Sequence, residues 1–194
     1  MDTTVGLRER KKAETRQAVH EATLRLVMEH GLDHVTVEAI ADAANISRRT
    51  FSNYFESKED ALLYGDEQRV AELVQLVRDQ PAEYSAWQAL RGAFASYYGE
   101  QGSPDREWLQ RARLAKQHPS LLARQLAGRV RLENELGQLL AGRVQPDGVD
   151  PMVIAGAFLA ALRIATHRWL AEEEARTLQE VSDEVLDQFA RPFR

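Results

Sequence analysis

The chain has 194 residues, of which 44% are hydrophobic and 28% are charged, the proportions of a globular protein rather than of a disordered or fibrous one. It contains no cysteine, which excludes disulfide frameworks, thiolate zinc sites and cysteine nucleophiles. The formal net charge is −5 at pH 7, so a partner made of phosphate would have to be recognised by a local cluster of basic residues.

No apolar run approaches the roughly 20 residues that a helix needs to cross a bilayer. The N-terminus reaches basic residues before any apolar block, unlike a secretory signal. We therefore expect a cytoplasmic protein with no membrane partner.

A first helix is predicted from about Arg10 to His30, because Val19, Ala22 and Leu26 recur at helical spacing, and Gly31 ends it. The start of this region is basic. Between Leu7 and Arg16 the bases outnumber the acids Glu9 and Glu14; they are Arg8, Arg10, Lys11, Lys12 and Arg16.

Two short helices follow, joined by a tight turn. Thr36 is a suitable N-cap for a helix over 37–44, and Ser47 for a second short helix. Asn45 lies between them and tolerates the left-handed conformation that a sharp turn needs. This is the pattern of a helix-turn-helix, whose second helix enters the major groove of DNA.

The second short helix has two different faces. Phe51 and Phe55 share the face that we expect to point to the core, which turns Arg49, Thr50 and Asn53 outward. Arginine can bind guanine with two hydrogen bonds, asparagine can bind adenine in the same way, and a threonine methyl can contact thymine. The outward face therefore predicts base recognition.

A long helix follows, opened by a capping box of Ser57 and Asp60 and running toward Pro81. Lys58 in its first turn lies beside free backbone N–H groups and could hold a phosphate. The candidate DNA-binding residues are Thr36, Ser47, Arg48, Arg49, Thr50, Ser52, Asn53, Tyr54, Lys58, Arg10, Lys11 and Lys12.

The rest of the chain keeps a helical period and shows no strand-like alternation. Loops are expected at Gly99–Pro104 and Pro146–Asp150, and capping signals at Asp150-Pro151 and at Thr177 with Glu180. Helices are predicted near 84–98, 105–117, 119–143, 151–172 and 177–191. The prediction is an all-α protein of about nine helices.

Residues from about Lys12 to Leu63 resemble the DNA-binding domain of the TetR family of bacterial transcriptional repressors. The resemblance lies in Ala44, Asn45, Ile46, Ser47, Arg48, Arg49, Thr50, Phe51, Ser52, Asn53, Tyr54 and Phe55, followed by Ser57, Lys58, Glu59 and Leu62. The sequence departs from the family pattern at Asn45 and Arg49, where glycine is common, and at Ser52, where tyrosine is common.

The resemblance implies a helix-turn-helix DNA-binding domain over residues 1–60 and a helical ligand-binding and dimerisation domain over residues 61–194. It implies double-stranded operator DNA, a small-molecule effector and a second copy of the chain as partners, with no cofactor and no metal. The acyl-coenzyme-A-binding branch of the family is a further, fainter resemblance, carried by the segment WLQRARLAKQHPSLLARQL.

Candidate ligand-binding residues are aromatic or basic: Phe94, Tyr98, Trp108, Arg111, His118, Arg131, Phe158 and Arg163. Candidate dimer residues form a stripe on the last two helices, where small residues allow close approach. They are Val153, Ala157, Ala160, Ala161, Ile164, Leu178, Val181, Val185, Leu186 and Phe189. An intramolecular core is the alternative, and some of the stripe must belong to it, but the dimer is favoured.

The sequence leaves two other classes of function open. An enzyme would have to use the carboxylates of Glu172, Glu173 and Glu174, or a metal on His30 and His34, but no third ligand is recognisable and no catalytic residues are assigned. A helical dimer or protein-interaction module without sequence-specific DNA binding is the alternative that overall acidity favours.

Overall fold

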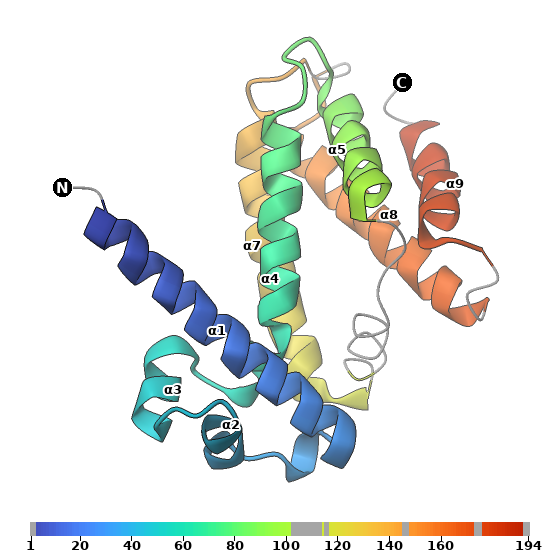
Figure 1. The fold of residues 1–194 in the computed structure, drawn as a ribbon. Coiled ribbons are helices and arrows are strands. Elements are labelled where there is room, and N and C mark those ends of the chain that lie inside the picture. The colour runs from blue at the N-terminus through green and yellow to red at the C-terminus, as the bar shows by residue number, and fades with distance from the viewer. Residues whose placement is uncertain (1–2, 102–113, 115–116, 145–147, 173–175, 192–194) are drawn as a thin grey trace. The chain divides into compact units, whose positions relative to one another are not determined.

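The computed structural model describes residues 3–101, 114, 117–144, 148–172 and 176–191 (Figure 1). All the elements in these ranges are helices, as predicted. They are α1 (Thr3–His30), the 3₁₀ turn η1 (Leu32–His34), α2 (Val37–Ala43), α3 (Arg48–Tyr54), α4 (Lys58–Arg78), α5 (Ala86–Gln101), α7 (Pro119–Leu140), α8 (Pro151–Ala171) and α9 (Leu178–Ala190). The helix expected over 105–117 lies outside the described residues, apart from Leu114 and Gln117.

Side-chain caps begin the helices where local sequence predicted them. Thr36 accepts a hydrogen bond from the Ala39 backbone, and Asp150 accepts one from Met152 with Pro151 in the first turn of α8. Thr177 and Glu180 form a complete capping box at the start of α9. Each cap satisfies an amide that the helix itself leaves without a partner.

Other boundaries differ from the prediction. α1 begins at Thr3 rather than near Arg10, so the basic segment is helical as well. α5 continues to Gln101, so the loop expected from Gly99 does not include Gly99, Glu100 or Gln101. The helical period alone does not locate these ends.

The described chain divides into two compact units, Met1–Gln68 and Arg69–Arg194. In the first unit, α1 packs against η1 and α2, and α2 packs against α3. Val19, Ile40, Phe51 and Leu62 are among its most deeply buried side chains. The core therefore draws on α1, α2, α3 and the start of α4.

The second unit is built around α8, which packs against α7, α9 and α5. Its length of 21 residues and mean hydropathy of 1.2 would also suit a membrane span, contrary to the reading of the sequence. Ile154, Phe158, Ala165 and Trp169 lie on the buried side of α8, so packing within the unit accounts for much of its apolar character.

Arg143, just beyond α7, holds the end of α4. Its guanidinium donates to the backbone oxygens of Val77 at 3.0 Å and Gln80 at 2.9 Å, and to that of Pro81 at 2.6 Å. These carbonyls belong to the last turn of α4 and the segment after it, where the regular helical hydrogen bonds end. The arginine therefore caps α4 from a distant part of the sequence.

Glycines allow α7 and α8 to approach closely. A Cβ atom on Gly137 of α7 would overlap the Met152 side chain of α8. A Cβ on Gly156 of α8 would lie 2.9 Å from the Oε1 atom of Glu133 of α7. Since the numbering falls on α7 as it rises on α8, the two helices run antiparallel.

This contact predicts opposite effects for two substitutions in the same helix. Gly137→Ala should lower the free energy of unfolding by about 1–3 kcal/mol, because Met152 would have to move in a close-packed contact. Gly128→Ala should raise it by about 0.5–1 kcal/mol, because its nearest neighbour is 4.0 Å away and alanine favours the helix. Chemical denaturation of both variants measures the difference, and equal effects would contradict the close approach.

Candidate nucleic-acid interface

A row of aromatic contacts fixes the orientation of α3. The ring centroids of Phe51 and Phe55 are 5.8 Å apart, and those of Phe55 and Tyr64 are 5.6 Å apart. Tyr64 in turn meets the buried ring of His20 edge-on at 6.1 Å. Because Phe51 and Phe55 are buried, the opposite face of α3 must point to solvent.

The turn before α3 is a Schellman motif. The Ile46 amide donates to Ala41 and the Asn45 amide to Asp42, which satisfies the last carbonyls of α2. Asn45 has a φ of 55°, the left-handed conformation that the sequence predicted for it. Ser47 then caps α3 by accepting a hydrogen bond from the Thr50 amide at 3.0 Å.

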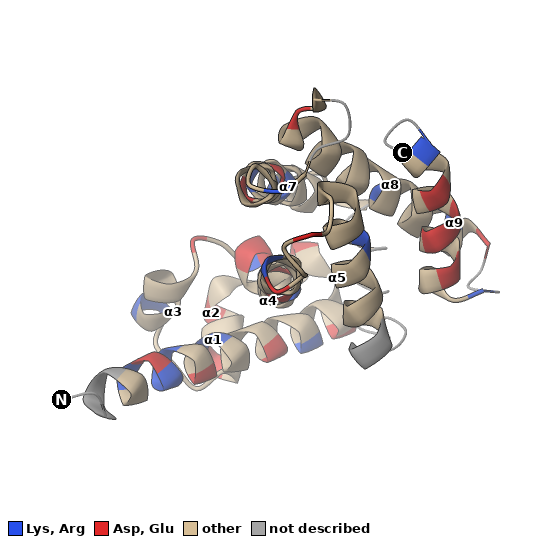
Figure 2. Ribbon diagram, turned by 90° about the horizontal axis from the view of Figure 1, so that it is seen from above, with Lys and Arg blue, Asp and Glu red and all other residues tan. Residues whose placement is uncertain are grey.

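Three predicted base- or backbone-contacting side chains, Arg49, Ser52 and Asn53, are exposed. In the part of the chain that the structure describes, Arg49 and Asn53 form no side-chain hydrogen bond or ion pair. Thr50 is half-buried and shares a hydrogen bond with Ser47, and Tyr54 is half-buried. The outward face of α3 thus presents donors without partners of their own, and α3 carries basic but no acidic residues (Figure 2).

Arg48 differs from Arg49 because it has a partner on α2. Its Nη1 atom lies 3.0 Å from the Oε1 atom of Glu38, and both side chains are largely exposed. The carboxylate accepts from the guanidinium in the way that a DNA phosphate would, so the two would compete for Arg48. Sequence reasoning did not detect this pair, since nothing in the local pattern brings residues 38 and 48 together.

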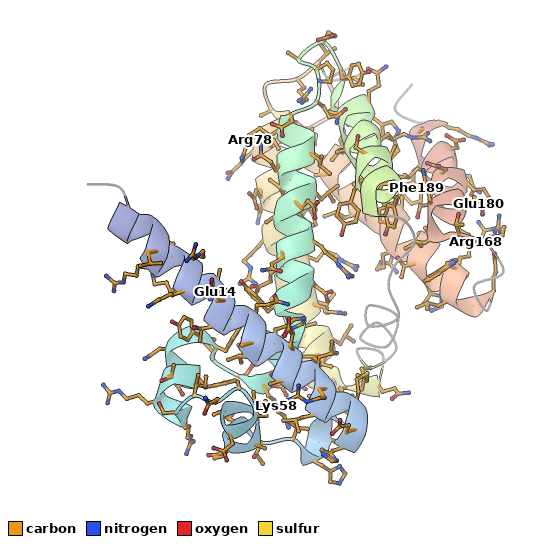
Figure 3. The ribbon with its side chains drawn as sticks, viewed as in Figure 1. Glu14, Lys58, Arg78, Arg168, Glu180 and Phe189 are labelled. Atoms are coloured by element: carbon orange, nitrogen blue, oxygen red, sulfur yellow. The ribbon has the colours of Figure 1, made fainter. Side chains whose placement is uncertain are left out.

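Lys58 forms part of the framework of the first unit. Its ammonium donates to the backbone oxygens of Leu32 at 2.7 Å and Val35 at 3.0 Å, and Figure 3 labels it at the start of α4. Ser57 caps the same helix through the Asp60 amide at 3.1 Å. A phosphate contact by Lys58 remains a prediction, with two of its three donors already used within the protein.

The basic residues of α1 are partly paired along their own helix. Lys12 lies 2.9 Å from Glu9, and Arg10 lies 3.4 Å from Glu14. Lys11 is exposed. Exposed pairs of this kind contribute little and exchange readily, so Arg10 and Lys12 can still turn toward a phosphate.

The candidate ligand residues are distributed over several environments. Phe94 and Phe158 are buried with their ring centroids 6.2 Å apart, so they form part of the core of the second unit. Tyr98 is partly buried against Phe94, and burial raises the pKa of its hydroxyl well above the usual value. Arg131 and Arg163 are exposed, His118 precedes α7, and Trp108 and Arg111 lie outside the described residues.

Burial divides the candidate dimer residues into two groups. Val153 is 54% exposed, and Ala157, Ala160, Ile164 and Phe189 are partly exposed. The other five are buried in the core of their own unit, and a role for them in a dimer stays a prediction. They are Ala161, Leu178, Val181, Val185 and Leu186.

An ion-pair network ties the end of α8 to α9. Arg176 pairs with Glu184 at 3.0 Å and with Glu172 at 2.8 Å, and Arg168 pairs with Glu184 at 3.1 Å. Figure 3 labels Arg168 on α8 and Glu180 at the start of α9. The hydrogen bond from Arg176 lowers the pKa of Glu184. Of the three acidic residues that an enzyme could use, Glu172 forms ion pairs, and Glu173 and Glu174 lie outside the described residues.

Metal binding finds no support in the described ranges. No group of three His, Asp or Glu side chains there could hold an ion. His30 ends α1 and lies 3.7 Å from Glu29, while His34 belongs to η1. Two short capped helices joined by a tight turn, with donors exposed on the second helix, form the helix-turn-helix of a DNA-binding protein.

Comparison with known proteins leads to the same class. Residues 20–64 match the family described as bacterial regulatory proteins, tetR family, and residues 84–194 match the MftR C-terminal domain of TetR regulators. The chain is 30% identical to the HTH-type transcriptional regulator TcmR of Streptomyces glaucescens over 94% of its own length and 85% of the relative. The chain therefore belongs to the TetR family of transcriptional regulators, as its sequence motif predicted.

Solved structures share the fold. The Stenotrophomonas maltophilia multidrug efflux pump repressor SmeT matches with a TM-score of 0.66 and 20% identity, over 92% of this chain and 89% of SmeT. Thermus thermophilus FadR, solved with lauroyl-CoA, matches with a TM-score of 0.60 and 24% identity, over 90% of this chain and 92% of FadR. Membership of a regulatory family makes the module without DNA binding the less favoured alternative.

The Arg48–Glu38 pair predicts that Glu38→Gln strengthens binding to duplex DNA of mixed sequence. Releasing Arg48 should raise the affinity about two- to fivefold at low salt. The plot of log affinity against log salt concentration should become steeper by about 0.9, which is the contribution of one additional phosphate contact. Fluorescence anisotropy over a salt series measures both quantities.

The matched control is Glu29→Gln, which changes the charge equally at the end of α1, where Glu29 pairs with His30. It should leave the slope unchanged. Equal gains in the two variants would mean that net charge alone is responsible.

Proposed function

We propose that the chain is a ligand-responsive repressor of the cytoplasm that binds a palindromic operator as a homodimer and is released by a small-molecule effector. The observation that carries the proposal is the outward face of α3, where Arg49 and Asn53 are exposed on a helix whose other face is buried. Arg49 and Asn53 would read bases. The other candidate residues would contact the DNA backbone and so fix the position of the protein on the duplex; they are Arg10, Lys11, Lys12, Thr36, Ser47, Ser52, Tyr54 and Lys58.

The dimer is supported by the exposed side of α8. Val153, Ala157, Ala160 and Ile164 recur at helical spacing, and all are small or apolar. A second copy packed against this stripe would remove it from water and display two recognition helices. Paired helices of this kind read half-sites about one turn of DNA apart.

The effector would act through the helices of the second unit. α4 contributes Leu62 and Tyr64 to the first unit and Val74 and Val77 to the core of the second. A molecule that binds the second unit with different affinity in two arrangements of its helices would shift the population of DNA-binding dimers. SmeT is a repressor and FadR was solved as a complex with lauroyl-CoA, and these two proteins of the same fold support a repressor role and a small-molecule effector.

The test begins with selection of bound fragments from the source genome to obtain an operator. Arg49→Ala should then lose about 1–3 kcal/mol of binding free energy at one base position, because a bidentate contact to one base is removed. Arg25→Ala on α1, also an exposed arginine, should retain the base preference. Competition binding against operators with single base changes measures the preference.

Lys58→Ala should act differently. It should weaken all DNA sequences alike and also lower the stability of the first unit by about 1–3 kcal/mol, because Leu32 and Val35 lose their hydrogen bonds from the ammonium. Binding isotherms and denaturation curves of the same protein separate the two effects. Loss of preference at one base in Lys58→Ala, or uniform loss in Arg49→Ala, would refute the division between positioning and reading residues.

A further inference from the structure

Most of the arginines that the structure describes in the second unit have a partner. Arg91 pairs with Asp183 and Asp187, and Arg143 donates to three backbone carbonyls. Arg168 and Arg176 share Glu172 and Glu184. An arginine that is partly buried and has no such partner is therefore an exception that needs a reason.

Arg129 on α7 is that exception. It is half-buried, and it forms no hydrogen bond or ion pair anywhere in the described ranges of the chain. The other described arginines of the unit in this situation are exposed; they are Arg131, Arg163 and Arg191. Water can solvate an exposed guanidinium, whereas a half-buried one loses part of that solvation.

Arg129 lies on the side of α7 that faces the core. Leu132 and Leu136 follow it at spacings of three and seven residues, and both are buried. Glu133, the acid one turn further on, does not pair with it and instead has its carboxylate beside Gly156 of α8. The guanidinium therefore lies beside buried leucines of its own helix and pairs with no carboxylate of the described residues.

A second arginine comes near from α8. In the antiparallel pair of helices, Gly137 lies against Met152 and Glu133 against Gly156. One turn further along α7 the same register places Arg129 opposite residue 160, which is within one turn of Arg163. Burial, together with the positive charge of Arg163, lowers the pKa of Arg129. Two like charges brought together by two helices destabilise the empty site and favour an anion between them.

We propose that Arg129, supported by Arg163, binds the anionic group of an amphiphilic effector, whose apolar part lies along the core-facing side of α7. This inference rests on the proposed function in that the bound molecule is taken to be the effector. The anionic group can be a carboxylate or a phosphate, since either accepts the paired hydrogen bonds of a guanidinium.

The test uses octanoate, octyl phosphate and octanol as probes with the full chain. Each is titrated below its micelle concentration while thermal unfolding is followed. Octanoate or octyl phosphate should raise the Tm of the wild type more than octanol does, and whichever is stronger identifies the group. In Arg129→Met the half-saturating concentration of that anion should rise about tenfold or more, because the variant loses a charge-assisted hydrogen bond to the anion.

Three further measurements separate recognition from structural damage. Without any probe, Arg129→Met should raise the Tm by about 1–3 °C, because an unpaired cation is replaced by an apolar chain of similar length. Arg129→Lys should keep part of the anion response. Arg124→Met, an equal charge change at an exposed position of α7, should keep all of it.

The proposal fails if Arg129→Met responds to the anions as the wild type does, if the wild type responds no more to the anions than to octanol, or if Arg129→Met lowers the Tm without a probe. Anisotropy of bound duplex DNA in the presence of the stronger anion is recorded separately. An Arg129-dependent rise in Tm without release of DNA would support the anion site and refute only its role as the effector site.

Discussion

The burial of one face of α3 is the constraint on which DNA recognition depends. Phe51 and Phe55 leave water because α3 packs against α2 and because the ring of Phe55 meets Tyr64 of α4, which in turn meets His20 of α1. A helix of seven residues has little stability alone, so tertiary packing maintains it. The same packing that forms α3 also directs Arg49 and Asn53 outward.

Features set by neighbouring residues were predictable from the sequence. The caps at Thr36, Ser47, Asp150 and Thr177 and the left-handed Asn45 depend on side chains within three residues of the backbone they satisfy. The helical class followed from the period of apolar residues, and the spaced motif around α3 identified the family.

Features that depend on distant residues were not predictable in this way. A stripe of apolar residues on α8 and α9 does not distinguish a core from an interface. The pattern predicts the same dimer role for Val185 and Val153, although of these two only Val153 is exposed. The bonds of Lys58 to Leu32 and Val35 cross more than 20 residues, and the Glu38–Arg48 pair joins two helices. The sequence does not single out Arg129, because residue type alone cannot indicate that a half-buried side chain has no partner among the described residues.

The bonds from Arg143 to the end of α4 have a consequence for local opening. Helix ends ordinarily fray, since their last carbonyls are held only by water. In α4 the carbonyl of Val77 is held by a guanidinium whose own backbone lies 66 residues further along the chain. Unwinding of this end must therefore break a link to the segment after α7, and amide exchange there will follow larger openings of the second unit rather than the breathing of a single turn.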